Sequence, residues 1–204
     1  MLVVGSTINI RFGRELCLIK VTKARLPCKD LFMPIYALGD LIPEIHPDAF
    51  IHPDAVIIGN VIIGAKSSVW PCAVLRGDTG QIRVGHSTSI QDGVVIHCTN
   101  EAHTVIGDRV TIGHNVHIEG ATIEDDTLIG SGAVLLHHVM VRTRGLVAAG
   151  AVLKEKTEVP SQALAVGVPA KIKEDAVAIG AFDWNVETYL KNVEWYSKEL
   201  RRID

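Results

Sequence analysis

From about residue 45 to residue 170 the chain carries an aliphatic residue roughly every six positions, usually followed by glycine or a small polar residue. The aliphatic and glycine pairs are Ile58-Gly59, Ile63-Gly64, Val84-Gly85, Ile106-Gly107, Ile112-Gly113 and Ile129-Gly130. An amphipathic α-helix would need apolar spacings of three and four, so the pattern excludes a helix here. A six-residue period is typical of a parallel β-helix, in which each unit contributes one short strand and one turn.

The period also predicts which residues lie side by side in successive coils. Three units make a coil of about 18 residues, and one aliphatic side chain of each unit points inward. The inward residues of one coil are then Val84, Ile90 and Ile96, and those of the next, after a bulge at 98–105, are Ile106, Ile112 and Ile118. His97 and Glu119 consequently occupy the same corner in adjacent coils, about 4.8 Å apart. The spacing alone does not fix the hand of the coil.

The limits of the period divide the chain into three segments. Residues 1–32 have no repeat, and we interpret them as an N-terminal arm or an upstream extension. Residues 33–173 are expected to form the β-helix domain. In residues 174–204, Asp183 is a suitable N-cap, and apolar residues follow it at helical spacing: Val186, Leu190, Val193 and Leu200. This pattern predicts a C-terminal α-helix that packs on a flank of the β-helix.

Composition and charge narrow the classes of partner. The net charge is −3 and charges of both signs are scattered, so we predict no nucleic-acid partner. No run of about 18 apolar residues is present to span a membrane, and polar residues interrupt the N-terminus where a secretory signal would be apolar. We therefore expect a cytoplasmic protein without membrane association. Only 5% of residues are aromatic, which predicts a narrow aliphatic core.

Histidines are concentrated in one part of the repeat. Four of the nine, His97, His103, His114 and His117, fall within 21 residues. Clustered imidazoles indicate a candidate metal site. His97 and Glu119 share a corner and can contact one ion, whereas His114 lies at a different corner. His114 can therefore reach such an ion only on a neighbouring chain.

Four motifs along the repeat occur in a specific order: Ser68-Val69-Trp70 to Leu75-Arg76-Gly77-Asp78, then Ile90-Gln91-Asp92-Gly93-Val94-Val95-Ile96-His97, then Ile112-Gly113-His114, and finally Gly167-Val168-Pro169-Ala170-Lys171. In this combination the chain resembles the gamma-class carbonic anhydrases and their relatives over about residues 34–173. The resemblance implies an all-β fold, a left-handed parallel β-helix of hexapeptide repeats. It also implies a homotrimer that binds a zinc or iron(II) ion at each subunit interface and interconverts CO2 and bicarbonate as a lyase.

The resemblance also assigns roles to single residues. Family members bind the metal with two histidines from one chain and one from its neighbour, and His97 and His114 match two of these positions. Arg76 and Asp78 match an ion pair between subunits. Gln91 and Asp92 match residues that orient the metal-bound water and the neighbouring ligands.

The third ligand position departs from the family pattern. The family has a histidine five residues after His114, where this chain has Glu119, and His117 lies two residues earlier. Glu119 shares the corner of His97, whereas His117 is displaced by about 6.6 Å along the strand. Both stay candidates for the third ligand, and we favour Glu119.

The positions of the family's acidic proton-shuttle residues also differ, because Thr79 and Asn100 provide the best match and Glu101 is only adjacent. This difference favours, as an alternative, a non-catalytic metal-binding or assembly subunit on the same fold. A second alternative is a hexapeptide acyltransferase. Such enzymes commonly add a long extruded loop, and the bulge at residues 98–105 is short.

Overall fold

The computed structural model describes residues 7–12 and 15–20 at the level of the backbone and residues 34–204 with their side chains. Residues 1–31 and 32–204 form two compact units. In the first unit, strands β1 (Thr7–Phe12) and β2 (Glu15–Lys20) pair as an antiparallel hairpin. Sequence analysis did not predict this hairpin, because the segment lacks the period that marks the rest of the chain.

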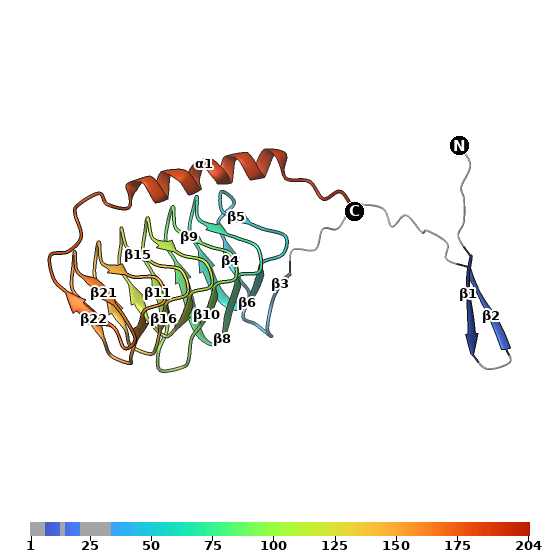
Figure 1. Ribbon diagram of the computed structural model, residues 1–204, viewed down its shortest axis with the longest axis horizontal. Coiled ribbons are helices and arrows are strands. Elements are labelled where there is room, and N and C mark those ends of the chain that lie inside the picture. Colours follow the sequence, from blue (N-terminus) through green and yellow to red (C-terminus); the bar gives the residue numbers. More distant parts are fainter. Residues whose placement is uncertain (1–6, 13–14, 21–33) are drawn as a thin grey trace. The chain divides into compact units, whose positions relative to one another are not determined.

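The second unit is a left-handed parallel β-helix of hexapeptide repeats followed by one α-helix, as predicted (Figure 1). One side is an eight-stranded sheet in the order β22 (Lys171–Lys173), β21 (Leu164–Val166), β18 (Leu146–Val147), β15 (Leu128–Ile129), β12 (Thr111–Ile112), β9 (Ser89–Ile90), β7 (Ser68–Val69) and β5 (Phe50–Ile51). All its pairings are parallel except that of β21 with β22.

The remaining strands of this unit form a twelve-stranded sheet: β3 (Ile35–Tyr36), β4 (Glu44–Ile45), β6 (Val56–Ile63), β8 (Val74–Val84), β10 (Val95–His97), β11 (Thr104–Ile106), β13 (His117–Glu119), β14 (Thr122–Ile123), β16 (Val134–Leu135), β17 (Met140–Val141), β19 (Val152–Leu153) and β20 (Glu158–Val159). The long strand β8 pairs with β10 through its first half and with β11 through its second half. It therefore belongs to two sides of the coil.

The predicted register between the two central coils is confirmed. The Cα partners are Val84 with Ile106, Ile90 with Ile112, and Ile96 with Ile118. These side chains belong to a continuous aliphatic core in which, among the described residues, no aromatic side chain takes part. Each fully buried Ile or Leu contributes about 1.5–3 kcal/mol by leaving water. The largest of them are Ile57, Ile63, Leu75, Ile82, Ile90, Ile96, Ile106, Ile112, Ile118, Ile123, Ile129 and Leu135.

Left-handed backbone conformations mark the corners of the coil. From Asp126 onward a residue with positive φ recurs every six positions: Asp126, Gly132, His138, Arg144, Gly150, Lys156 and Gln162. The left-handed region costs a residue with a side chain about 1–2 kcal/mol. From Asp126 to Lys156 each corner donates its backbone N–H to a carbonyl of the preceding coil, for example Arg144 N to Asp125 O at 3.0 Å, and these hydrogen bonds offset the cost.

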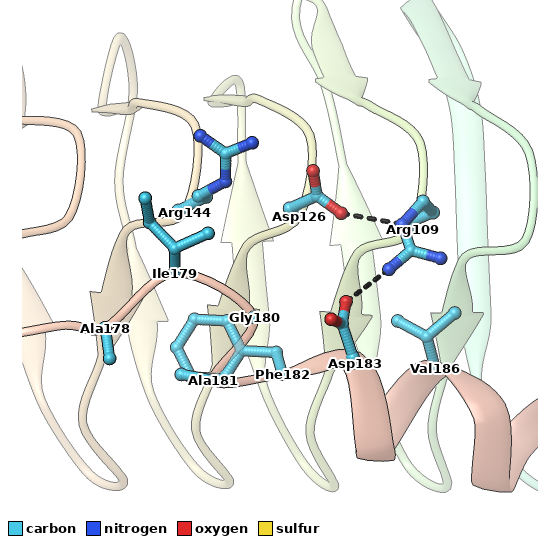
Figure 2. A pocket seen from close by; sticks show the side chains of 10 residues that line it. All are labelled: Arg109, Asp126, Arg144, Ala178, Ile179, Gly180, Ala181, Phe182, Asp183 and Val186. Atoms are coloured by element: carbon cyan, nitrogen blue, oxygen red, sulfur yellow. Dashed lines mark hydrogen bonds and ion pairs between the residues drawn. The ribbon is translucent and has the colours of Figure 1, made fainter.

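Helix α1 (Asp183–Glu199) lies along the eight-stranded side of the coil (Figure 1). Its first turn is held by Arg109, whose guanidinium lies between Asp126 and Asp183 (Figure 2). The prediction that Asp183 caps the helix is wrong: Phe182 is the N-cap and its side chain makes no capping hydrogen bond, and Asp183 pairs with Arg109 instead. Leu200, expected on the packed face, is the exposed C-cap residue.

The middle of α1 packs through aromatic rings on the coil. Trp70 is 4% exposed, and its ring centroid lies 5.6 Å from that of Tyr189 and 5.0 Å from that of Tyr196. Val186, nearer the start of the helix, is also buried. Along the residues that the structure describes, we find no helix with the length and hydropathy needed to cross a bilayer.

Candidate functional site

His97 and Glu119 lie side by side on adjacent coils, as the period predicts. They are Cα partners at the ends of β10 and β13. Their neighbours Ile96 and Ile118 are fully buried in the core, so the alternation of a strand turns the side chains of His97 and Glu119 outward. His97 Nδ1 lies 3.5 Å from Glu119 Oε1, and both side chains are about three-quarters buried or more.

Asp78 stands between His97 and Arg76. One of its oxygens accepts from the Arg76 guanidinium, and the other lies 3.3 Å from His97 Nε2. Burial raises the pKa of Asp78, but the hydrogen bond and charge of Arg76 outweigh this and hold the pKa below its usual value. Gly77 is required between them because a Cβ there would lie 2.5 Å from the carbonyl oxygen of Asn60.

His114 follows β12 and is paired with a carboxylate of its own. Its Nδ1 lies 3.0 Å from Asp92 Oδ2, and both side chains are about half exposed. The structure gives His114 no contact with His97 or Glu119 within the described chain. Correspondingly, no three His, Cys, Asp or Glu side chains of one described chain come together in a way that could hold a metal ion.

His117 and His137 flank the same glutamate. His117 Nε2 lies 4.0 Å from Glu119 Oε2, whereas His137 Nε2 lies 3.5 Å from Glu119 Oε1. Sequence reasoning assigned His137 no role. The strand register does not place His137 opposite Glu119: His117 and Ile118 pair with Val134 and Leu135, so His137 lies one position beyond the residue that follows in register.

Beside His137 the surface is hollowed into a groove of about 600 Å³, which Thr79, Asn100 and Glu101 also line. Its rim is the bulge, a tight turn in which Thr99 N donates to Ala102 O at 2.9 Å. The two positions that best match the family's shuttle residues, Thr79 and Asn100, therefore lie in one groove and carry no acidic group.

Two further residues near the bulge have structural contacts. His103 Nδ1 accepts from the backbone of Gln81 at 3.0 Å. Cys98 is fully buried in the core, and burial, followed by the charge of Asp78, raises the pKa of its thiol. Cys98 follows His97 in sequence but points to the opposite side of the strand.

Comparison with known proteins identifies the family to which the fold belongs. The family description "Bacterial transferase hexapeptide (six repeats)" matches residues 43–77 and 103–137. Gamma carbonic anhydrase 1, mitochondrial, of Arabidopsis thaliana is 44% identical over 138 residues, which cover 65% of this chain and 50% of that protein. The carnitine operon protein CaiE of Salmonella agona (strain SL483) is 36% identical over 140 residues, 69% of this chain and 71% of CaiE.

A solved structure of a hexapeptide transferase family protein from Anaplasma phagocytophilum is 32% identical with a TM-score of 0.76, covering 80% of this chain and 98% of that one. The chain therefore belongs to the hexapeptide-repeat family of left-handed β-helix proteins, in the group that contains the gamma carbonic anhydrases. It spans about half the length of the gamma carbonic anhydrases that it matches.

Proposed function

We propose that this protein is a homotrimer that binds a zinc or iron(II) ion at each subunit interface and catalyses the reversible hydration of CO2 to bicarbonate. The observation that carries the proposal is the pair of donor atoms on adjacent coils, His97 Nδ1 and Glu119 Oε1, 3.5 Å apart. Two ligands of one tetrahedral zinc ion, each about 2.0–2.2 Å from the metal, lie about 3.4 Å from each other. The spacing therefore fits two neighbouring ligands of a single ion.

The surroundings of His97 and His114 also fit metal ligands. A ligating histidine commonly donates its second ring N–H to a carboxylate, which fixes the orientation of the ring. Asp78 lies next to Nε2 of His97, and Asp92 lies next to Nδ1 of His114. In each case one ring nitrogen faces a carboxylate and the other is left for an ion.

The trimer follows from the placement of the ligands on the coil. His114 makes no contact with His97 and Glu119 in its own chain, so the set of three is completed only if a neighbouring chain supplies His114. Arg76 pairs with Asp78 within the chain, on the side of Asp78 away from His97. In the trimer we expect this pair to lie at the same interface.

Glu119 is the stronger candidate for the third ligand. Its side chain is 26% exposed and directly faces His97, whereas that of His117 is 42% exposed and its Nε2 lies 4.0 Å from Glu119 Oε2. Glutamate with two histidines is an established ligand set for catalytic zinc. When bound, the ion supplies Lewis-acid chemistry that lowers the pKa of its bound water to about 7.

Residues around the ion would orient its ligands and the reacting molecules. Gln91 is 5% exposed and lines a groove together with His114, so its amide is placed to orient a water molecule or CO2 beside the ion. Asp92 orients the ring of His114. Arg76 acts through Asp78, whose carboxylate it keeps ionised and therefore able to accept from His97.

A non-catalytic metal-binding or assembly subunit is the second candidate function. The observation that favours it is that Thr79 and Asn100, which match the positions of the family's shuttle residues, carry no carboxylate, although Glu101 and Glu155 line the same groove. An acyltransferase on the same fold is a third candidate. It is disfavoured because the bulge closes as a tight turn rather than an extended arm.

The test is metal analysis of protein purified without added metal, combined with stopped-flow CO2 hydration and light scattering. We expect one ion per chain in a trimer, and hydration that requires the ion. Metal binding without hydration would support the assembly subunit instead. A stable monomer at micromolar concentration would remove the basis of the site.

Two substitutions, Glu119→Gln and His117→Ala, then identify the third ligand. We expect the first to lose metal and the second to retain it, and the reverse pattern would assign the role to His117. Glu101→Gln is the matched control, because Glu101 lies in the groove without a place among the proposed ligands. Retention of metal in both variants would refute the three-ligand site.

A further inference from the structure

A second groove lies between α1 and the eight-stranded side of the coil. Its volume is about 340 Å³, at the lower end of the range of about 300–1,000 Å³ found for small-molecule sites. The floor is formed by β12 and β15 and includes Leu128 and Thr111. The wall comes from the first half of α1, with Trp184 and Tyr189, and one edge reaches His114.

Thr111 gives this groove an unused hydrogen-bonding group. Its neighbour Ile112 points into the core, so Thr111 faces outward beneath the helix. The residue is 1% exposed, and its hydroxyl oxygen finds no hydrogen-bond partner in the described part of the chain. Leaving such a group unpaired costs about 1–3 kcal/mol.

The neighbouring strands show why the hydroxyl is left over. On the same outer face, the hydroxyls of Ser68 and Ser89 lie 3.3 Å apart, and both accept from the indole N–H of Trp70. Thr111 is the next outward residue after Ser89, and Leu128 follows it. The row of hydroxyl side chains formed by Ser68, Ser89 and Thr111 therefore ends at Thr111. The hydroxyl of Thr111 faces the groove, and the next side chain in the row, Leu128, is apolar.

The lining also defines the charge of an occupant. No Lys, Arg, Asp or Glu lines this groove in the described structure, and its single ionisable imidazole, His114, already faces Asp92. Burial, and then the charge of Asp92, raises the pKa of Tyr189, so its phenol is neutral at physiological pH. Gln91, 5% exposed, adds an uncharged amide. A charged ligand would lose its hydration here without gaining a counter-charge.

We propose that this groove binds a small uncharged organic molecule with a ring or branched aliphatic body and one carbonyl or amide group. The body lies between Leu128 and the aromatic side chains of α1, and the carbonyl accepts from the hydroxyl of Thr111. The groove is the one in which Gln91 and His114 are proposed to act. The inference does not depend on the proposed CO2 chemistry, because the contacts with Leu128, Thr111 and the aromatic side chains require no metal.

The experiment uses benzamide as the probe and the full chain after dialysis against EDTA, with binding followed by ligand-detected NMR and calorimetry. Benzamide should bind saturably and benzoate, which has the same shape and a negative charge, more weakly. Thr111→Val removes only the hydroxyl and should weaken benzamide binding about 2- to 12-fold, the equivalent of one hydrogen bond. Because the hydroxyl is unpaired, this variant should fold at least as stably as the parent.

Tryptophan variants provide the positional control. Trp184→Ala should weaken benzamide binding, whereas Trp195→Ala, on the same helix but outside the groove, should not. Equal affinity in the parent and Thr111→Val would mean that the hydroxyl meets only water, and this would overturn the proposal. Absence of saturable binding by the parent would overturn it as well. Metal content and CO2 hydration are measured separately, so either idea can fail alone.

Discussion

Trp70 offers the sharpest test of how α1 is attached to the coil. Its ring contacts Tyr189 and Tyr196 of the helix, and its indole N–H donates to Ser68 Oγ at 2.9 Å and Ser89 Oγ at 3.1 Å. Burying an aromatic side chain of about 150–250 Å² at about 25 cal/mol per Å² is worth about 4–6 kcal/mol. Measured Phe and Trp to Ala changes cost about 3–5 kcal/mol. We expect Trp70→Ala to lower the free energy of unfolding by about 3–5 kcal/mol.

The assay is urea unfolding followed by circular dichroism, with the protein concentration held constant because an oligomer's stability depends on it. Trp195→Ala is the matched control. Trp195 is 59% exposed and lies on the same helix, so its loss should change the free energy of unfolding by less than about 0.5 kcal/mol. If both variants lost the same amount, or if Trp70→Ala lost under about 1 kcal/mol, Trp70 would not be the anchor that we describe.

Three further predictions concern acid stability, backbone packing and the tail. The hydrogen bond from Arg142 lowers the pKa of Glu124 in the folded protein. The ionised Glu124 therefore stabilises the fold fully above the usual carboxyl pKa, and this stabilisation is lost as the pH falls through the lower pKa of the folded state. Glu124→Gln should be less stable than the parent at neutral pH, and the two should converge in acid unfolding. Gly77→Ala should lower the melting temperature, because its Cβ would lie 2.5 Å from Asn60 O, and an unchanged melting temperature would contradict the close approach. Truncation after Lys173 should lower the melting temperature but retain bound metal; loss of metal from an intact trimer would give the tail a direct part in the site.

Much of the site was predictable because the fold is periodic. Once the six-residue spacing and the bulge at 98–105 are recognised, the pairing of Ile96 with Ile118 follows, and with it the adjacency of His97 and Glu119. Asp78 was expected only as a partner of Arg76. Its approach to His97 depends on how closely β8 and β10 pack, which spacing does not specify.

Other side-chain contacts depend on how distant segments of the chain pack together, and the six-residue period does not determine this packing. Asp183 has the right chemistry for a helix cap, but Arg109, 74 positions earlier, takes its carboxylate. The unpaired hydroxyl of Thr111 arises because its neighbours across the strands are Ser89, which accepts from Trp70, and the apolar Leu128. The approach of His137 to Glu119 is also not set by the period, because His117 pairs with Val134 and His137 therefore lies one position beyond the register of Glu119.

The path of α1 also bears on how the domain unfolds. In a solenoid each coil contacts only its neighbours, so stability behaves as a chain of nearest-neighbour terms and the ends can fray independently. Helix α1 contacts Phe50 and Trp70 near one end and Arg109 several strands further along, which joins coils that do not touch. Each of these coils contacts α1, so opening any one of them breaks a contact with the same helix. We therefore expect the coils beneath α1 to open together as a single cooperative unit, and those beyond its reach to exchange their amide protons first.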